Sequence, residues 1–171
     1  MVRRRKNSVE EEPSQGFENA WRLHDAQMDW TGKVDAKAAF SLTVQAALLG
    51  AAVVLLAEMN TWIEYVLLGT SVALVSAGAV YAARVVAPQL RTGSVAKESA
   101  SNFIYFGHAR AWKPENLAHE LRRTDLTEQL ARQVVIMADI AWTKHRRVGW
   151  SIWLGLAGGA FLLAAAAVSR I

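Results

Sequence analysis

The sequence predicts an all-α integral membrane protein whose three transmembrane helices are prolonged into a small cytoplasmic helical bundle. Two observations predict this fold class. The chain of 171 residues is 53% hydrophobic although 20% of its residues are charged. The apolar residues are gathered in three long blocks, each close to the roughly 20 residues that a helix needs to cross a hydrocarbon core.

The blocks place the predicted spans at residues 38–57, 65–86 and 148–169. The first two spans are close enough to form a hairpin, with residues 58–64 as its turn. The first block begins too far from the N-terminal basic residues to be the apolar region of a cleaved signal peptide, so we expect it to be retained. A buried core helix explains one such block, but three in a chain of this length favour a membrane protein.

Lysine and arginine residues predict the orientation. Seven of the 19 precede the first span, eleven lie between Arg84 and Arg147, and one follows the third span. The positive-inside rule then places the N-terminus and the central segment in the cytoplasm, and the hairpin and the C-terminus outside the inner (plasma) membrane. Attraction to membrane lipid accounts for the net charge of +4, so we predict lipid and not nucleic acid as the charged partner.

The residues outside the spans predict a leader and a set of helices. Residues 1–16 are rich in charge and predict a disordered leader. Residues 17–37 predict a cytoplasmic helix that continues into the first span, because no proline interrupts it. Residues 87–147 predict a cytoplasmic helical region, which follows a second spanning helix ended by Pro88.

Three helices are predicted within residues 87–147. The first runs from about Val95 and stops at Gly107. The second begins at Pro114, because proline suits the first turn of a helix. The third starts near Asp125 and continues through Gly149 into the third span, without a strong helix breaker.

Small residues recur at helical spacing in two of the spans. The third span carries Gly155 and Gly159, and the second carries Gly69, Ala73 and Ala77. This spacing allows close helix contact in lipid, although an alanine-rich sequence also places small residues without such a role. The apolar faces of the cytoplasmic helices need partners as well, and we expect a homo-oligomer.

The sequence carries no motif for catalysis. It has no cysteine, and its four histidines are scattered without the spacing of zinc ligands. It contains no phosphate-binding loop, dinucleotide fingerprint or nucleophile elbow. We therefore predict that the protein is not an enzyme and needs neither a metal nor a cofactor.

The cytoplasmic part does carry the residue types that bind a small anionic ligand with a base. Aromatic rings for stacking are Trp21, Trp30, Tyr105, Phe106, Trp112 and Trp142. Amides and carboxylates for polar edges are Asn102, Asp25, Asp29, Asp35, Gln129 and Gln133. Cations for a phosphate are Arg110, Lys37, Arg132 and Lys144. Packing within the bundle is the competing explanation for the aromatic residues, and a belt at the membrane interface explains other tryptophans.

Three stretches of the chain resemble the transmembrane effector family of Pycsar anti-phage defence. They are WRLHDAQMDWTGKVDAKAAF before the first span, SNFIYFGHA after the second, and LTEQLARQVVIMADIAWTKHRRVGW leading into the third. The resemblance runs from about Trp21 into the third span. It rests on the order of these stretches around the spans, because none is a mechanistic signature by itself.

The resemblance implies a function. In such systems a partner cyclase makes cyclic UMP or cyclic CMP during phage infection. The effector senses this cyclic pyrimidine mononucleotide in the cytoplasm and impairs the inner membrane, which causes abortive infection. The residues implied as ligand contacts are Asn102, Tyr105, Phe106, Gly107, Trp21, Asp35, Lys37, Gln133 and Lys144.

Roles for four of these residues follow from the resemblance. Tyr105 or Phe106 would stack on the pyrimidine, Gly107 would allow a close backbone approach, and Asn102 would read the base. Two other functions fit the residues. A small channel or transporter subunit without nucleotide input predicts constitutive conductance, and a membrane scaffold protein predicts no toxicity. The sequence leaves open which pyrimidine nucleotide is sensed.

Overall fold

The computed structural model describes residues 13–88, 99 and 102–170. This part of the chain is 83% helical and has no strand. Three of its helices are long and apolar enough to cross a membrane, which confirms the predicted fold class. In the most apolar 18-residue stretch of each of these helices, only 17%, 28% and 22%, respectively, is buried within the chain. The remaining apolar surface is larger than a water-soluble monomer normally exposes, so lipid is its expected solvent.

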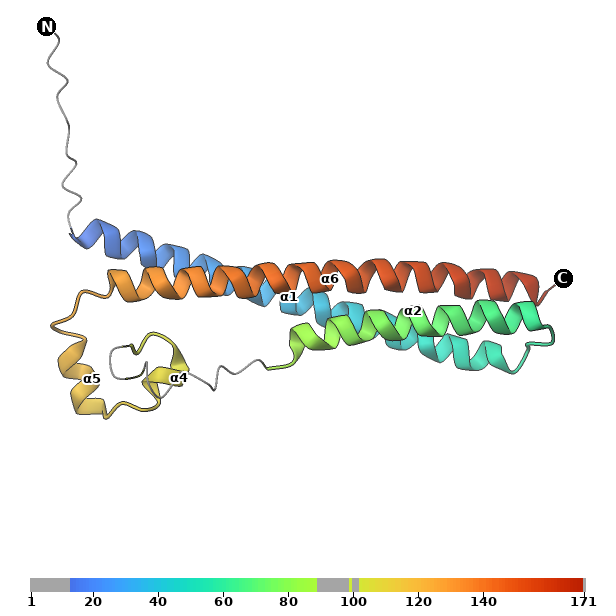
Figure 1. Cartoon of the computed structure of the whole chain (residues 1–171), viewed down its shortest axis with the longest axis horizontal. Helices are drawn as coiled ribbons and strands as arrows, with labels where there is room; N and C mark the ends of the chain where they lie inside the picture. Colours follow the sequence, from blue (N-terminus) through green and yellow to red (C-terminus); the bar gives the residue numbers. More distant parts are fainter. Residues whose placement is uncertain (1–12, 89–98, 100–101, 171) are drawn as a thin grey trace, which may run out of the picture. The chain divides into compact units, whose positions relative to one another are not determined.

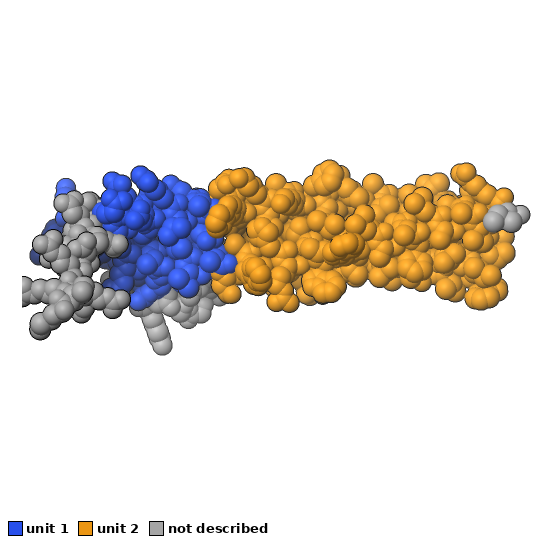
Figure 2. Space-filling model, turned by 90° about the horizontal axis from the view of Figure 1, so that it is seen from above, with its two compact units in different colours: residues 1–28, 90–138 blue, residues 29–89, 139–171 orange. Residues whose placement is uncertain are grey.

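The chain divides into two compact units (Figure 2). Unit 1 comprises residues 1–28 and 90–138, and unit 2 comprises residues 29–89 and 139–171. Unit 2 contains the apolar parts of the three spanning helices. Two of those helices are continuous between the units and contribute residues to both.

Unit 2 is a bundle of three helical segments (Figure 1). They belong to α1 (Pro13–Leu56), α2 (Trp62–Val86) and α6 (Thr127–Val168). One cluster of buried residues comprises Val34, Ala38, Ala82, Val85 and Val148, and another comprises Ala52, Met59, Leu68, Leu162 and Ala165. The first cluster joins the N-terminal part of each α1 and α6 segment to the C-terminal part of α2. The second joins the C-terminal parts of α1 and α6 to the N-terminal part of α2, so α2 runs antiparallel to the other two.

The helices of unit 2 approach most closely at two glycines. A Cβ atom on Gly158 of α6 would lie 2.5 Å from Cγ2 of Val75 and 3.0 Å from the backbone oxygen of Ser71. A Cβ atom on Gly78 of α2 would lie 3.0 Å from the backbone oxygen of Ser151. Because any side chain would collide with backbone here, these glycines fix where α2 and α6 cross.

Buried polar side chains join the same helices. The Gln45 amide nitrogen donates to the hydroxyl of Ser151 at 2.9 Å and to its carbonyl at 3.0 Å. The hydroxyls of Ser41 and Ser151 are 2.9 Å apart. The Ser71 hydroxyl donates to the carbonyl of Gly158 at 2.7 Å. No water competes for such groups in lipid, and each interhelical bond is worth about 0.6 kcal/mol on average.

Only one of the two predicted sets of small residues faces another helix. Gly155 is buried, and a Cβ atom there would lie 3.3 Å from the Gln45 amide nitrogen. The other set is exposed and consists of Gly69, Ala73 and Ala77. Within the described helices, this set makes no close helix contact, which fits the alternative that an alanine-rich sequence places small residues without such a role. α2 packs instead through the neighbouring face that carries Gly78, because this face offers the closer backbone approach.

The first helix begins earlier than predicted. α1 starts at Pro13, so residues 13–16 are helical and do not belong to the leader. Proline favours this position because its missing N–H group has no partner in the first turn of a helix. The rest of the predicted leader, residues 1–12, lies outside the described residues.

The hairpin between the first two spans is shorter than the predicted 58–64. α2 begins at Trp62 because the Glu64 carboxylate caps it. This carboxylate accepts hydrogen bonds from the backbone N–H groups of Asn60 at 2.6 Å and Thr61 at 3.1 Å. The other end of α2 agrees with the prediction, since the helix ends at Val86, two residues before Pro88.

Unit 1 contains two short helices and the N-terminal parts of α1 and α6. The short helices are α4 (Phe106–Ala109) and α5 (Pro114–Glu120), and α5 begins at the predicted proline. At the start of α6, the backbone N–H of Thr127 donates to the Asp125 carboxylate at 2.9 Å. This hydrogen bond lowers the pKa of Asp125 below its ordinary value, because it stabilises the ionised form.

The predicted helix from Val95 to Gly107 is wrong in its described part. Residues 102–105 are not helical, and Gly107 lies inside α4 and does not end a helix. The non-helical backbone buries Phe103, whose ring packs edge-on against Trp112 with 5.5 Å between centroids. Tertiary packing of the aromatic rings therefore overrides local helix propensity. Except for residue 99, the earlier part of this prediction lies outside the described residues.

Candidate functional site

Polar side chains of unit 1 meet around a small cavity. Its lining residues are Asn102, Ile104, Tyr105, His108, Gln129, Arg132, Gln133 and Ile136. The cavity measures about 20 Å³, which is room for about one water molecule. Drug-sized ligands occupy pockets of roughly 300–1,000 Å³, so the cavity in this structure is too small for such a ligand.

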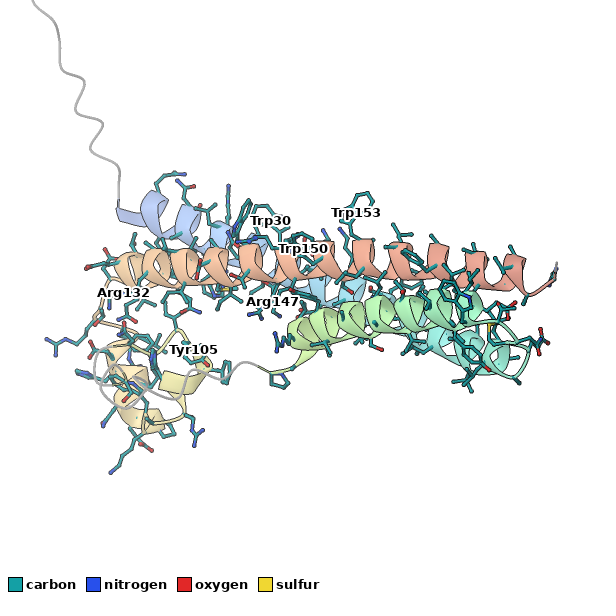
Figure 3. The ribbon with its side chains drawn as sticks, turned by 45° about the vertical axis from the view of Figure 1, so that its right-hand side comes forward. Trp30, Tyr105, Arg132, Arg147, Trp150 and Trp153 are labelled. Carbon is teal, nitrogen blue, oxygen red and sulfur yellow. The ribbon has the colours of Figure 1, made fainter. Side chains whose placement is uncertain are left out.

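One wall of the cavity is the N-terminal part of α6. Gln129, Arg132 and Gln133 are three and four residues apart and therefore share one face of the helix. The neighbouring Leu130 is completely buried, and its packing fixes the rotation of α6 about its own axis. Arg132 extends from α6 toward the segment that carries Tyr105 (Figure 3).

The opposite wall is the segment from Asn102 to His108. Tyr105 lies in extended conformation directly before α4. Its ring centroid is 4.5 Å from that of Phe106 and 5.3 Å from that of His108, which it meets edge-on. A Cβ atom on Gly107 would overlap the Tyr105 ring, so only glycine leaves the ring in this place.

Two groups in the cavity wall lack partners within the described part of the chain. The Gln129 side-chain oxygen is buried and accepts no hydrogen bond there. Arg132 is exposed and forms no ion pair with a described residue. Buried acceptors are normally paired, so a water molecule or a ligand that enters the cavity finds an acceptor in Gln129.

Three of the predicted site residues line this one cavity, namely Asn102, Tyr105 and Gln133. Phe106 and Gly107 adjoin it without lining it. Phe106 is 65% exposed and packs on Tyr105. The close approach predicted at Gly107 is made by the ring of Tyr105 from the same chain.

The other predicted site residues have different surroundings. In unit 1, the ring of Trp21 stacks between Phe17 and His24, with centroid distances of 6.5 and 5.5 Å. In unit 2, the Lys144 ammonium donates to both oxygens of the Asp35 carboxylate, at 2.7 and 2.8 Å. These residues are not among those that line the cavity, and their predicted role in ligand binding stays a prediction.

Lys37 also lies in unit 2, where it lines an apolar groove between α1 and α6. Its predicted contact with a nucleotide stays a prediction too. The chain contains no group of three or more histidine, aspartate or glutamate residues, among those the structure describes, that is arranged to hold a metal ion.

The cavity lining includes residues outside the set that the resemblance implies, although Gln129 and Arg132 were candidates by residue type. His108, Gln129 and Arg132 line the cavity together with two isoleucines. The spacing of Gln129, Arg132 and Gln133 on one helix face is a signal that could have found the α6 wall. No spacing rule could have found His108, because it lies in α4, a helix of four residues that is too short to carry a periodic pattern.

The fold and the cavity define a multi-pass helical membrane protein with a polar cavity outside its spans. The chain belongs to the Pycsar effector family, because the Pycsar effector protein domain (PycTM) matches residues 19–171, which is nearly the whole chain. Its role therefore lies in Pycsar anti-phage defence. No curated protein and no solved structure shows significant similarity to the chain.

Proposed function

We propose that the protein is a ligand-gated membrane effector of a bacterial Pycsar system. It senses cyclic UMP or cyclic CMP, made by a partner cyclase, through the cavity of unit 1. Binding then changes the packing of the spanning helices, impairs the inner membrane and causes abortive infection. The observation that carries the proposal is the convergence of Asn102, Tyr105, Gln129, Arg132 and Gln133 on one cavity.

The cavity wall supplies the chemistry that a cyclic pyrimidine nucleotide requires. The ring of Tyr105 offers a π face for stacking on the base. The unpaired oxygen of Gln129 accepts a base N–H, such as the amino group of cytosine. The guanidinium of Arg132 pairs with the cyclic phosphate, and the amides of Asn102 and Gln133 read the remaining polar edges.

The small size of the cavity supports a switch. A nucleotide does not fit into about 20 Å³, so binding requires the two walls to separate. A ligand that binds only the open form shifts the population toward it. The wall on α6 belongs to the same uninterrupted helix as the third span, because α6 runs from Thr127 to Val168. Movement of this wall is therefore connected covalently to the membrane.

The proposed topology places the N-terminus and unit 1 in the cytoplasm, where the nucleotide is made. Six basic residues of unit 2 support it, since they all lie near the same end of the bundle, namely Lys33, Lys37, Arg84, Lys144, Arg146 and Arg147. The exposed apolar side chains of the first part of α1, including Leu23 and Met28, support a homo-oligomer.

The proposed topology can be tested by labelling single introduced cysteines, because the chain contains no cysteine of its own. We expect Asn60→Cys in the hairpin to react with a membrane-impermeant maleimide in spheroplasts. Thr124→Cys, before α6, should react only after lysis. The opposite labelling pattern would invert the proposed topology.

The function is tested by dye entry into cells that express the full chain, with or without a cyclase making cyclic UMP or cyclic CMP. We expect entry only with a nucleotide, and comparing the two cyclases identifies the ligand. Arg132→Gln should abolish the response. Arg122→Gln is the matched control, because this exposed arginine is outside the cavity. Entry without any nucleotide would favour a plain channel, and no entry under any condition would favour a scaffold.

A further inference from the structure

An apolar groove runs between α1 and α6 in unit 2. Its volume is about 660 Å³. Its lining residues are Lys37, Phe40, Ser41, Val44, Gln45, Leu48, Ile152, Gly155, Leu156, Gly159, Ala160, Leu162 and Leu163. The large side chains along it are open to the outside, since Phe40 is 72% exposed and Leu163 is 73% exposed. The groove therefore faces the surroundings of the bundle, which in a membrane are lipid.

Small residues of α6 create the groove. Gly159 leaves space where a side chain would otherwise fill the contact with α1, and Gly155, which packs against Gln45, contributes to the same lining. A Cβ atom on Gly159 would meet only Leu48, at 3.8 Å, which is an ordinary van der Waals distance. The space is thus not needed for the approach of the two helices at Gly159, and it remains available to another molecule.

The length of the groove matches one leaflet of a bilayer. Along α1 it extends from Lys37 to Leu48, which is about 17 Å at a rise of 1.5 Å per residue. Half of a hydrocarbon core is about 15 Å. A second copy of the chain would be expected to contact the helices over the full thickness of the membrane, whereas a lipid tail occupies a single leaflet.

A lysine side chain lies at one end of the groove. Lys37 is the one charged residue in the lining, and it forms no ion pair with a residue in the described ranges. Its neighbour one turn earlier, Lys33, instead pairs with Asp29 at 2.6 Å. Basic groups at the mouths of clefts between spanning helices bind anionic lipid headgroups.

A second apolar groove, between α1 and α2, shows the difference that Lys37 makes. It has a volume of about 470 Å³ and contains Leu56, Tyr65 and Gly69 in its lining, without any charged residue. This groove offers an anionic headgroup no partner. The groove at Lys37 combines an apolar channel with a cation at its mouth.

We propose that the groove between α1 and α6 is a binding site for an anionic phospholipid. One acyl chain lies along the channel over Gly155 and Gly159, and the phosphate of the headgroup pairs with the Lys37 ammonium. The lipid would be a resident of the bundle and separate from the nucleotide of unit 1. In this proposal Lys37 binds a lipid phosphate and not the nucleotide that the family resemblance implies as its partner.

The test is native mass spectrometry of the full chain, purified in detergent and mixed with phosphatidylglycerol or phosphatidylethanolamine of identical acyl chains. We expect wild type to retain one phosphatidylglycerol about fivefold more tightly than phosphatidylethanolamine, the effect of one lysine. Lys37→Gln should remove this preference and leave the weaker binding of both lipids. Gly159→Leu should fill the channel and weaken the binding of both.

Matched controls separate the site from general effects of charge and bulk. Lys33→Gln removes a charge of the same sign one turn away, outside the lining. Gly50→Leu adds the same bulk to α1 where a Cβ atom would meet nothing within 4 Å. Both should bind lipid like wild type. The proposal is overturned if Lys37→Gln keeps the preference, or if Gly159→Leu leaves lipid binding intact. Loss of oligomer mass in Gly159→Leu with unchanged lipid binding would assign the groove to a second copy.

Discussion

The polar side chains inside unit 2 and those around the cavity of unit 1 are packed in different ways. In unit 2, Ser41, Ser71 and Ser151 are buried and hydrogen-bonded to other helices, at points where glycines bring the backbones together. In unit 1, the amides and the arginine line a small cavity, and the Gln129 side-chain oxygen accepts no hydrogen bond from a residue that the structure describes. The first arrangement holds helices together, and the second supports the proposed binding of a ligand.

Gly158 and Gly107 show this difference, because an added Cβ atom would meet backbone at the first and a side chain at the second. An added Cβ atom on Gly158 would collide with the backbone of α2, which cannot move without separating the helices. An added Cβ atom on Gly107 would collide with the ring of Tyr105, a side chain at the cavity wall. The spanning bundle therefore resists change at its contacts, whereas the cavity has a wall that can move.

The largest expected effect is the removal of the stacking ring in unit 1. Tyr105→Ala should weaken nucleotide binding between about 5-fold and about 150-fold, because base stacking on an aromatic ring is worth about 1–3 kcal/mol. Tyr105→Phe keeps the ring and should bind within about twofold of wild type. Titration calorimetry of the full chain in detergent measures both. Equal nucleotide affinity of the alanine and phenylalanine variants would show that the Tyr105 ring does not stack on the base.

The next effect concerns the packing of unit 2. Gly158→Ala should destabilise the protein by about 1–3 kcal/mol, because the new methyl group overpacks the contact with Val75 and Ser71. Gly159→Ala is the matched control on the same helix, since its Cβ atom meets Leu48 at 3.8 Å. Thermal unfolding in detergent compares them. If the two variants unfold alike, the described crossing of α2 and α6 is wrong.

A smaller effect is expected at the unpaired acceptor. Gln129→Ala should weaken nucleotide binding by about 2-fold to 10-fold, the range of one hydrogen bond. Glu128→Ala changes the neighbouring exposed residue and should have no effect. Binding curves for cyclic UMP and cyclic CMP show which base depends on this oxygen. An unchanged affinity for both nucleotides would mean that Gln129 does not contact the base.

The sequence predicts unit 2 better than unit 1, for physical reasons. Apolar length and helical spacing are local properties, so the three spans and the continuity of α6 could be predicted. The crossing at Gly78 and Gly158 depends on which faces meet, and the spacing of small residues left this open. In unit 1, the site residues Asn102, Tyr105 and Gln133 were found through a family resemblance. His108 was missed because a tertiary fold, and no periodicity, brings it to the cavity.

The ion pair between Asp35 and Lys144 tests whether two of the predicted ligand residues are structural. Their side chains are 38% and 14% exposed, so solvent partly screens the pair. Asp35→Asn, Lys144→Gln and the double variant should give a coupling energy of about 1 kcal/mol or less. Nucleotide affinity should stay within about twofold in all three, since one hydrogen bond to a ligand would be worth more. Loss of nucleotide affinity in both single variants would show that Asp35 and Lys144 take part in ligand binding.

The smallest effect is expected at the start of α6, two residues before the cavity wall at Gln129. The N–H of Thr127 stabilises the ionised Asp125 carboxylate and lowers its pKa. A carboxyl with a lowered pKa contributes stability above its ordinary pKa and loses this contribution as the pH falls through the lowered value. Asp125→Ala should therefore increase hydrogen exchange in the first turn of α6 at neutral pH, and the difference from wild type should vanish in acid. A difference that persists below the lowered pKa would show that Asp125 acts without its charge.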